Sequence, residues 1–212
     1  MNEAVSSSTP FRLAVLGSGK GSNFAAIAEA CQTKAIPAEV AFVISDVPDA
    51  GILARARAAN IESWVLPPSR YRTKLEEPVE MMLIEELKKR KIDLIVLAGF
   101  MRILKGAVLR EFANRVINIH PSLLPSFPGL EAWKQALDYG VKHTGVTVHF
   151  VDQGIDTGPI IAQATVPVME GDTAETLHAR IQEQERLLYP IAIGSLASGK
   201  VIIQGRQTRL AL

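Results

Sequence analysis

Cysteine is nearly absent from this sequence, with Cys31 the only one among 212 residues. A single cysteine excludes an internal disulfide and any zinc site built from cysteines. A reducing compartment is the simplest setting for such a chain, so we expect a cytoplasmic location. The histidines and acidic residues have no spacing typical of metal ligands, and we therefore expect no catalytic metal.

The sequence also lacks an excess of either charge and any long apolar run. The 23 Lys and Arg residues almost balance the 22 Asp and Glu residues, which leaves a formal net charge of +1. This balance argues against a broad electrostatic contact with nucleic acid. No run of 18 apolar residues suggests a membrane span, and the start MNEAVSSSTP has neither the basic nor the apolar region of a secretory signal. We expect small-molecule substrates as partners, with no nucleic acid and no membrane, and we leave the oligomeric state open.

Length and composition indicate one globular domain. Hydrophobic residues make up 48% of the chain and charged residues 21%, as in ordinary soluble proteins. A chain of this length can bury a single sizeable core without disulfides or metals. We expect a frayed tail over residues 1–9, a single domain over 10–205 and a second tail over 206–212.

Apolar runs alternate with amphipathic patterns along the chain, which predicts an α/β fold. The helix pattern is clearest at 77–89, and the run LIVLA at 94–98 is typical of a strand covered on both faces. We expect an open, mostly parallel, Rossmann-like sheet with helices on both faces. The predicted strands are 11–16, 40–44, 62–66, 94–98, 115–119, 146–151, 160–168 and an edge strand at 200–204. The other predicted helices are 23–31, 52–59, 104–112, 130–139 and a long one that runs toward residue 196.

The long last helix carries two special features. Asp172 followed by Glu175 resembles a capping box at its start, although the cap is Asp rather than Ser or Thr. Pro190 lies inside the helix, and proline lacks the amide hydrogen that the helix ladder needs. We therefore expect a kink or an interruption at Pro190.

A glycine-rich loop follows the first predicted strand. Residues 17–23 read GSGKGSN and run directly into a helix. Glycine lets a backbone approach a ligand closely, and a helix N-terminus presents amide groups and a positive dipole end, so the loop predicts an anion site, most naturally for phosphate. Ser22 and Phe24 stand where a dinucleotide-binding loop needs glycine, and Gly21 follows Lys20 where a Walker loop needs Ser or Thr. The alternative is a tight strand-to-helix turn without a ligand.

Asn118 and His120 lie at the end of the strand predicted over 115–119. Because they are two residues apart, they project to the same side of the strand. Open parallel sheets bind ligands beyond the carboxyl ends of their strands. An amide and an imidazole together can stabilise an oxyanion and transfer a proton. An alternative of equal weight is a buried histidine and asparagine that a turn backbone satisfies.

A second polar loop joins the strands predicted over 146–151 and 160–168. It contains Asp152 and Asp156 among glycines and a proline. A carboxylate at Asp156 could orient His120 or accept a proton through water. The alternative is that both aspartates only form turns with their own backbone.

The remaining histidines receive weaker assignments. Thr147 and His149 share one face of the strand before this loop, and an ordinary half-covered strand face explains them at least as well as a direct role. We assign His143, in a predicted loop, and His178, in a predicted helix, to the surface.

Taken together, four segments resemble the phosphoribosylglycinamide (glycinamide ribonucleotide) formyltransferases, a family of purine biosynthesis. The segments are GSGKGSN at 17–23, LAGFMRIL at 97–104, NIHPSLLPSFPG at 118–129 and GVTVHFVDQGIDTGPII at 145–161. The resemblance extends over about residues 11–205. It implies the formyltransferase fold and transfer of a formyl group from 10-formyltetrahydrofolate to the amine of the ribonucleotide.

The resemblance also implies roles for particular residues. The catalytic trio, which the wider formylfolate-using superfamily shares, would be Asn118, His120 and Asp156. The phosphate and ribose of the substrate would be bound by Gly21, Ser22, Asn23, Phe24 and Glu185. The folate would be bound by Met101, Arg102, Ile103, Leu104 and Asn118. The family also places an arginine near the folate; the segment PPSRYRTKLEEP departs from the family pattern there, so Arg72 or Arg70 could serve.

The implied reaction needs no covalent enzyme nucleophile. The substrate amine would attack the formyl carbon, Asn118 and protonated His120 would stabilise the oxyanion, and Asp156 would favour the imidazolium and relay the proton. One alternative is another 10-formyltetrahydrofolate-dependent formyltransferase or a deformylase. A different class of alternative is a phosphate-binding module without catalysis.

Overall fold

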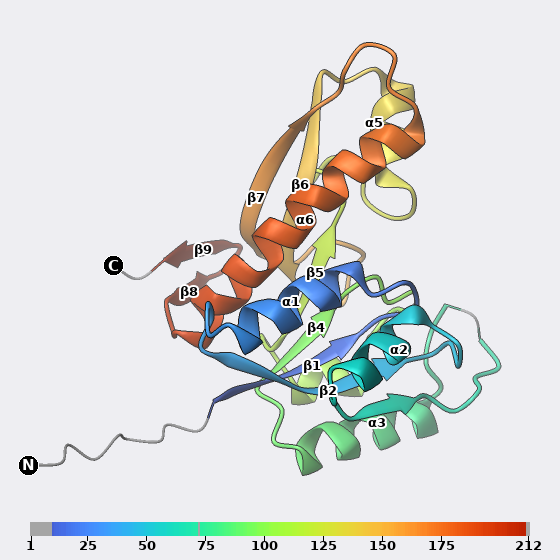
Figure 1. Ribbon diagram of the computed structural model, residues 1–212, viewed down its shortest axis with the longest axis vertical. Helices are drawn as coiled ribbons and strands as arrows, with labels where there is room; N and C mark the ends of the chain where they lie inside the picture. Colours follow the sequence, from blue (N-terminus) through green and yellow to red (C-terminus); the bar gives the residue numbers. More distant parts are fainter. Residues whose placement is uncertain (1–9, 72, 211–212) are drawn as a thin grey trace, which may run out of the picture.

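A seven-stranded sheet forms the centre of the computed structural model, which describes residues 10–71 and 73–210 (Figure 1). The first five strands are parallel, β6 is antiparallel to β5, and β7 is antiparallel to β6. The predicted open, mostly parallel α/β sheet is therefore confirmed. In the spatial order β3-β2-β1-β4-β5-β6-β7, the strands are β3 (Ser63–Val65), β2 (Ala38–Ser45), β1 (Phe11–Leu16), β4 (Leu94–Leu97), β5 (Val116–His120), β6 (His143–Phe150) and β7 (Ile160–Pro167).

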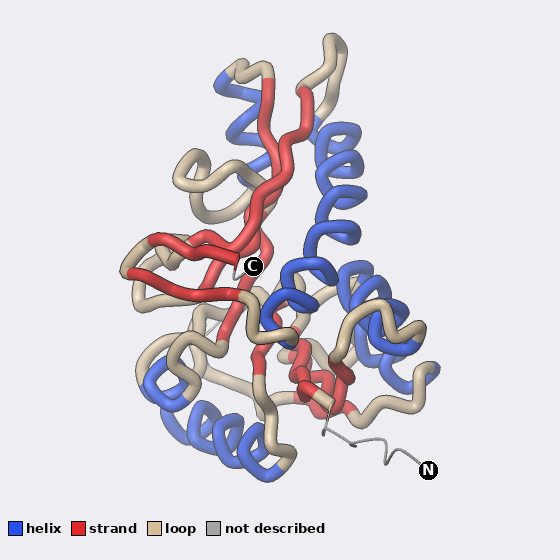
Figure 2. Tube along the Cα trace, turned by 90° about the vertical axis from the view of Figure 1, so that its left-hand side faces the viewer, coloured by secondary structure: helices blue, strands red, loops and turns tan. Residues whose placement is uncertain are grey.

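Helices cover both faces of the sheet because its central strands are apolar on both sides. Strand residues such as Val15 and Val96 are buried against α1, α2 and α6, whereas Ala14 and Ile95 are buried against α3 and α4. The strands β6 and β7 extend away from the other strands (Figure 2), and the helix α5 packs on α6 beside this extension. The helices are α1 (Ser22–Gln32), α2 (Gly51–Ala58), α3 (Glu77–Lys89), α4 (Ala107–Glu111), α5 (Ala132–Tyr139) and α6 (Ala174–Ala197).

The strand order reverses between β1 and β4. The chain moves from β1 outward through β2 to β3 and then returns to β4 on the other side of β1. At such a switch point the loops after the two central strands diverge, and α/β sheets bind ligands in the crevice that results. These loops are residues 17–21 after β1 and 98–106 after β4. They are in contact, because the Ser18 amide donates a hydrogen bond to the Gly99 carbonyl oxygen at 3.0 Å.

Two helix starts differ from the prediction. The helix expected over 104–112 is shortened to α4, because Gly106 with φ of 62° is its non-helical N-cap. The capping box of α6 consists of Thr173 and Thr176 rather than Asp172 and Glu175. Asp172 instead forms an ion pair with Arg180 at 2.8 Å. Thr173 and Thr176 both carry short hydroxyl side chains, and each hydroxyl accepts a hydrogen bond from the backbone amide of the other residue. This reciprocal pair replaces the capping that was expected from Asp172.

The last helix runs through Pro190 as one unbroken element, so of the expected kink or interruption, the interruption is wrong and the kink stays a prediction. Buried residues on both sides of the proline, Ile181 and Tyr189 before it and Ile193 after it, hold α6 against the molecule. Packing of an apolar helix face therefore outweighs the local cost of the proline.

The C-terminal part of the fold also differs from the prediction. Residues expected as an edge strand form β8 (Val201–Gln204), but this strand pairs with β9 (Gln207–Leu210) in a separate two-stranded sheet. A tail from residue 206 is therefore wrong, because Gly205 with φ of 61° turns the chain back into a hairpin. The hairpin is anchored near the loop that carries Asp156, since Thr208 Oγ1 donates to the Ile160 carbonyl oxygen at 2.6 Å. The predicted tail over 1–9 lies outside the described residues.

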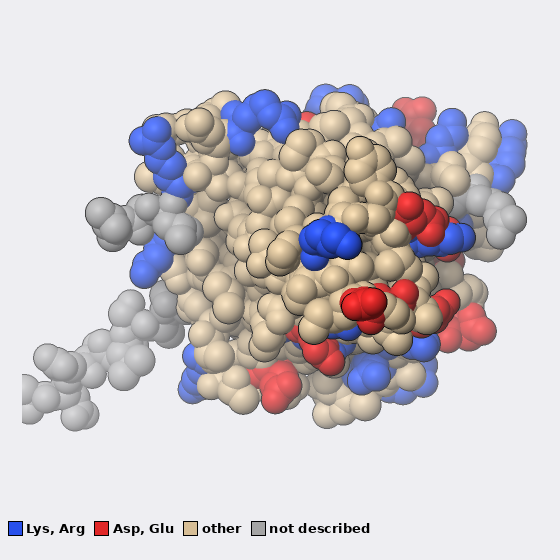
Figure 3. Space-filling view, turned by 90° about the horizontal axis from the view of Figure 1, so that it is seen from above, with Lys and Arg blue, Asp and Glu red and all other residues tan. Residues whose placement is uncertain are grey.

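The surface carries charged side chains of both signs (Figure 3). Acidic and basic side chains are interspersed around the face seen from above in Figure 3. Between residues 10 and 210, leaving aside residue 72, the helices are too short or too polar to cross a membrane.

Cys31 is partly buried on α1, and this burial raises the pKa of its thiol to about 11. The thiol is therefore protonated near neutral pH, as expected of a packing residue.

Candidate active site

The loop between β1 and α1 requires glycine for a steric reason. Gly21 has φ of 76°, and a Cβ atom there would lie 2.8 Å from Cα of Ile52. The helix begins at the next residue, so by helix geometry the amides of Ser22, Asn23 and Phe24 have no acceptor within α1. The Phe24 side chain is buried in the core, which leaves only its backbone amide for a ligand. This arrangement can bind an anion such as a phosphate.

Glu185 reaches the same helix start from α6. Its carboxylate accepts a hydrogen bond from Asn23 Nδ2 at 2.9 Å, and only 7% of the residue is exposed. Burial raises the pKa of the Glu185 carboxyl, because the charged form loses its water. Within residues 10–71 and 73–210, the buried Oδ1 atom of Asn23 finds no hydrogen-bond partner. The helix start thus carries two buried acceptors, the Asn23 amide oxygen and the Glu185 carboxylate.

Asn118 and His120 project from the face of β5 that points away from α1 and α6. The alternate residues Ile117 and Ile119 are buried in the core on the opposite face. Asp156, from the loop between β6 and β7, meets this pair: its Oδ2 atom lies 3.4 Å from His120 Nδ1. The predicted neighbourhood of the imidazole and the carboxylate is therefore present in the structure.

The imidazole of His120 lies between two acceptors. Its Nε2 atom is 2.9 Å from the carbonyl oxygen of Phe127, and a carbonyl can only accept, so Nε2 carries a proton. Nδ1 faces the Asp156 carboxylate. Asp156 is itself oriented by the Gly129 amide, which donates to Oδ2 at 2.8 Å. The ring is therefore held between a backbone carbonyl and a carboxylate.

His149 belongs to the same cluster, although the sequence could not decide its role. The antiparallel register of β5 and β6 places it directly opposite Asn118. Its Nδ1 atom donates to the Phe150 carbonyl oxygen at 2.8 Å, so Nε2 is left as an acceptor at 3.3 Å from Asn118 Nδ2. Burial lowers the pKa of His149, which keeps the ring neutral near pH 7.

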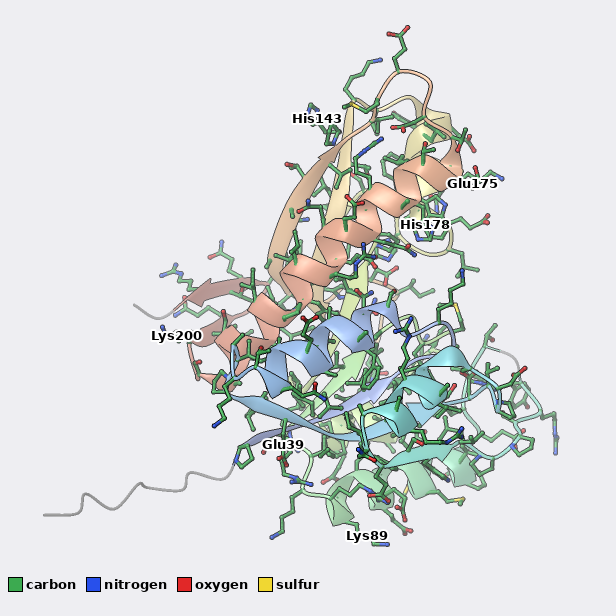
Figure 4. All side chains as sticks on the ribbon, viewed as in Figure 1. Glu39, Lys89, His143, Glu175, His178 and Lys200 are labelled. Atoms are coloured by element: carbon green, nitrogen blue, oxygen red, sulfur yellow. The ribbon has the colours of Figure 1, made fainter. Side chains whose placement is uncertain are left out.

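Thr147, the other residue on that strand face, organises a loop. Its buried hydroxyl donates to the Ser122 carbonyl oxygen at 2.7 Å and accepts from the Leu124 amide at 3.0 Å. His143 is exposed at the start of β6, and His178 stacks on Trp133 with ring centroids 3.6 Å apart. Figure 4 shows both histidines at the end of the molecule where β6, β7 and α5 meet α6, away from the strand ends described above.

The segment after β4 presents apolar side chains next to the polar cluster. Met101 and Ile103 are 59% and 37% exposed, whereas Leu104 is buried. The Arg102 guanidinium is turned inward, where it pairs with Asp46 at 2.8 Å. Arg72 lies outside the described residues. The side chain of Arg70 is 82% exposed and forms a loose ion pair with Glu76 at 3.9 Å.

The glycine loop and the polar cluster lie close together because their strands are close. β4 lies between β1 and β5, and two strand spacings amount to about 10 Å. Sequence reasoning missed Asp46 and Gln153, whose Oε1 atom accepts a hydrogen bond from the Gly106 amide at 3.3 Å. The only signal for Asp46 is its position just after a predicted strand. In the described part of the chain, His, Cys, Asp and Glu form no group of three or more that could hold a metal ion.

Comparison with known proteins gives consistent matches over nearly the whole chain. The profile of a family described as formyl transferase matches residues 11–193. A Bacillus subtilis protein named phosphoribosylglycinamide formyltransferase is 43% identical over 185 residues, which cover 87% of this chain and 94% of that protein. The crystal structure of glycinamide ribonucleotide transformylase 1 from Symbiobacterium toebii matches with a TM-score of 0.93 and 47% identity, covering 99% of this chain and 98% of the other. A formyltetrahydrofolate deformylase from Pseudomonas syringae matches with a TM-score of 0.88 and 27% identity, covering 96% of this chain and 66% of the other.

Proposed function

The chain belongs to the formyl transferase family, and on this premise we propose that it is a phosphoribosylglycinamide formyltransferase. It transfers the formyl group of 10-formyltetrahydrofolate to the amine of 5'-phosphoribosylglycinamide and forms the N-formyl product and tetrahydrofolate. This is a step of de novo purine (IMP) biosynthesis. The observation that carries the proposal is the proximity of an anion-binding helix start to the cluster of Asn118, His120 and Asp156.

The ribonucleotide binds at the start of α1. Its phosphate accepts hydrogen bonds from the amides of Ser22, Asn23 and Phe24, which Gly21 leaves open to a ligand. Its ribose hydroxyls donate to the Glu185 carboxyl. This assignment is supported by the burial of Glu185 next to Asn23, because a buried acceptor gains most from an added donor.

The formylfolate binds along the segment after β4. The exposed side chains of Met101 and Ile103 provide an apolar surface for the pterin ring, while Leu104 contributes backbone groups. Arg102 supports this segment from inside through its ion pair with Asp46. Arg70 or Arg72 approaches the folate, and the exposure of the Arg70 side chain supports its accessibility to an anionic group.

The chemistry is a direct attack of the substrate amine on the formyl carbon. The formyl oxygen becomes an oxyanion in the tetrahedral intermediate; Asn118 Nδ2 donates a hydrogen bond to it, and the positive charge of protonated His120 stabilises it. Asp156 stabilises the imidazolium and accepts, through water, the proton that the amine loses. When the intermediate collapses, the bond between the formyl carbon and N10 of the folate breaks, and N10 takes up this proton through the water, which releases tetrahydrofolate. Hydrogen bonds between catalytic groups are often long before the substrates bind. The 3.4 Å distance between His120 Nδ1 and Asp156 Oδ2 is consistent with a hydrogen bond that shortens when the substrates bind.

The reaction is tested with purified protein, phosphoribosylglycinamide and 10-formyltetrahydrofolate, by following the folate absorbance. Conversion that requires the ribonucleotide is expected. Formylfolate loss that proceeds equally without it would instead identify a hydrolase, the second candidate, which the structural match to a deformylase favours. Binding without turnover would contradict both enzymes. A cytoplasmic location, small-molecule partners and the absence of a metal requirement stay predictions.

A further inference from the structure

Asp46 holds two separate loops at the carboxyl edge of the sheet. It directly follows β2, and its side chain is only 8% exposed. One carboxylate oxygen accepts a hydrogen bond from Ser18 Oγ at 2.5 Å, and the other accepts one from Arg102 Nε at 2.8 Å. A single carboxylate is thus shared between the glycine loop and the loop after β4.

Ser18 joins the same two loops from the glycine side. While its hydroxyl donates to Asp46, it also accepts a hydrogen bond from the Met101 amide at 2.9 Å. A hydroxyl can do both because it has one donor and two acceptor lone pairs. With the backbone bond between Ser18 and Gly99, the glycine loop is connected to the segment 99–104 by two direct hydrogen bonds and by the bridge through Asp46.

Arg102 extends the connection to a third loop. Its side chain is 12% exposed, and beyond Asp46 it donates to the carbonyl oxygen of Tyr71. The neighbouring Ile103 amide donates to the Thr73 carbonyl oxygen at 2.9 Å. Because a guanidinium is planar with its donors in a fixed fork, its position at Asp46 also fixes the backbone of the loop around Tyr71.

We propose that Asp46 is a positioning residue that couples the ribonucleotide subsite to the folate subsite. This inference rests on the proposed function, which assigns the glycine loop to one substrate and the segment 101–104 to the other. Ligand binding orders one loop, and the shared carboxylate transmits that order to the other loop. Each substrate therefore binds more tightly when the other is present, and by linkage the two factors are equal.

The coupling is measured by calorimetric titration of phosphoribosylglycinamide and tetrahydrofolate, each alone and each in the presence of the other. Tetrahydrofolate lacks the formyl group, so no reaction occurs. In the wild-type protein we expect each affinity to rise about 5-fold or more with the other ligand, the lower range of measured couplings. In Ser18→Ala, which retains the ion pair of Asp46 and Arg102, we expect this factor to fall below about 2-fold.

A second variant removes the carboxylate of Asp46 itself. Asp46→Ala leaves no side-chain acceptor at position 46, so it loses the hydrogen bonds from both Ser18 and Arg102. We expect the same loss of coupling and a higher KM for both substrates, with a smaller change in kcat. A purely structural role would instead lower the melting temperature and leave the coupling factor intact.

Asp172→Ala provides the matched control. The Asp172 side chain is 4% exposed and pairs with Arg180 at 2.8 Å, in a place outside both subsites. We expect this variant to keep the wild-type coupling. Two results would overturn this inference without contradicting the proposed function. One is an active wild-type protein whose coupling factor is near 1, and the other is a Ser18→Ala protein that keeps the wild-type coupling factor. A wild-type protein that converts no formylfolate contradicts the proposed function instead.

Discussion

The Nε2 atom of His149 lies 3.3 Å from Nδ2 of Asn118, and this histidine nitrogen can only accept a hydrogen bond. The contact therefore selects the orientation of the Asn118 amide, because its NH₂ group rather than its oxygen must face His149. One hydrogen of that NH₂ group binds His149, and the second stays available for an oxyanion. The proposed oxyanion donor thus depends on a neutral histidine on the neighbouring strand.

Replacing His149 with phenylalanine keeps a ring of similar size and removes the acceptor. The Asn118 amide then loses its preferred orientation, so we expect kcat to fall by about 10–100-fold, less than the full loss of an oxyanion donor. The kcat of His149→Phe, measured at saturating substrates, checks this. Unchanged kcat in a folded variant would show that Asn118 is oriented by other contacts.

The same substitution should alter the pH dependence of stability. The pKa of His149 is lowered in the folded protein, so between that pKa and about 6.5 the unfolded chain binds more protons. The contribution of His149 to the free energy of unfolding is therefore complete above pH 6.5 or so and declines as the pH falls. Urea unfolding at pH 7.5 and pH 5.5 should show a smaller decline for His149→Phe than for the wild type, and equal declines would contradict the assignment.

His120 and Asp156 should be required for turnover but not for folding. We expect His120→Ala and Asp156→Asn to lower kcat by about 10²–10⁴-fold, the range typical of general acid and base groups. Steady-state kinetics and thermal unfolding of the same samples separate the two effects. His143→Ala removes an exposed histidine and should leave turnover unchanged. Turnover near the wild-type level in either of the first two variants would remove that residue from the mechanism.

Glu185→Gln should stabilise the protein and weaken substrate binding. The pKa of Glu185 is raised by burial, so its contribution to the free energy of unfolding is lost as the pH rises through the folded pKa. Glutamine stays neutral, and the variant should melt at a higher temperature than the wild type at pH 8 but not at pH 4. The KM for the ribonucleotide should increase. A lower melting temperature at pH 8 would show that the ionised carboxylate is well satisfied in the fold.

The C-terminal hairpin should affect catalysis through the loop of Asp156. Arg206 donates a hydrogen bond to the carbonyl oxygen of Thr157 at 2.9 Å, one residue beyond Asp156. We expect Arg206→Ala to lower kcat by about 2–10-fold, as for loss of one modest hydrogen bond, with little change in melting temperature. Arg209→Ala on the same hairpin is the matched control. Equal kcat values for the two variants would argue against this support.

The sequence was sufficient where local pattern decides the structure. Helix α3 has the predicted bounds, because its apolar positions repeat with helical spacing and a proline stands in its first turn. The hairpin at the C-terminus was missed, because a short strand pattern does not reveal its partner. Asp172 was mistaken for a cap because neighbouring Thr173 competes for the same role.

Within the candidate site, the limit was register and long-range contact. The resemblance suggested that Asn118, His120 and Asp156 belong together, but the place of His149 follows from the pairing of β5 with β6, which sequence spacing does not determine. Asp46 was not predicted for a similar reason, since it is 28 residues from Ser18 and 56 residues from Arg102. Such contacts arise from the strand order of the whole sheet.

Cys31 makes the chain well suited to site-specific labelling. Only the thiolate form reacts readily with maleimides and similar reagents, and a pKa of about 11 leaves very little of it at neutral pH. A cysteine introduced at an exposed position, such as the hairpin turn, should therefore carry a fluorophore selectively while the native residue is retained. Movements of the loops around both substrates could then be followed by fluorescence in an otherwise unaltered chain.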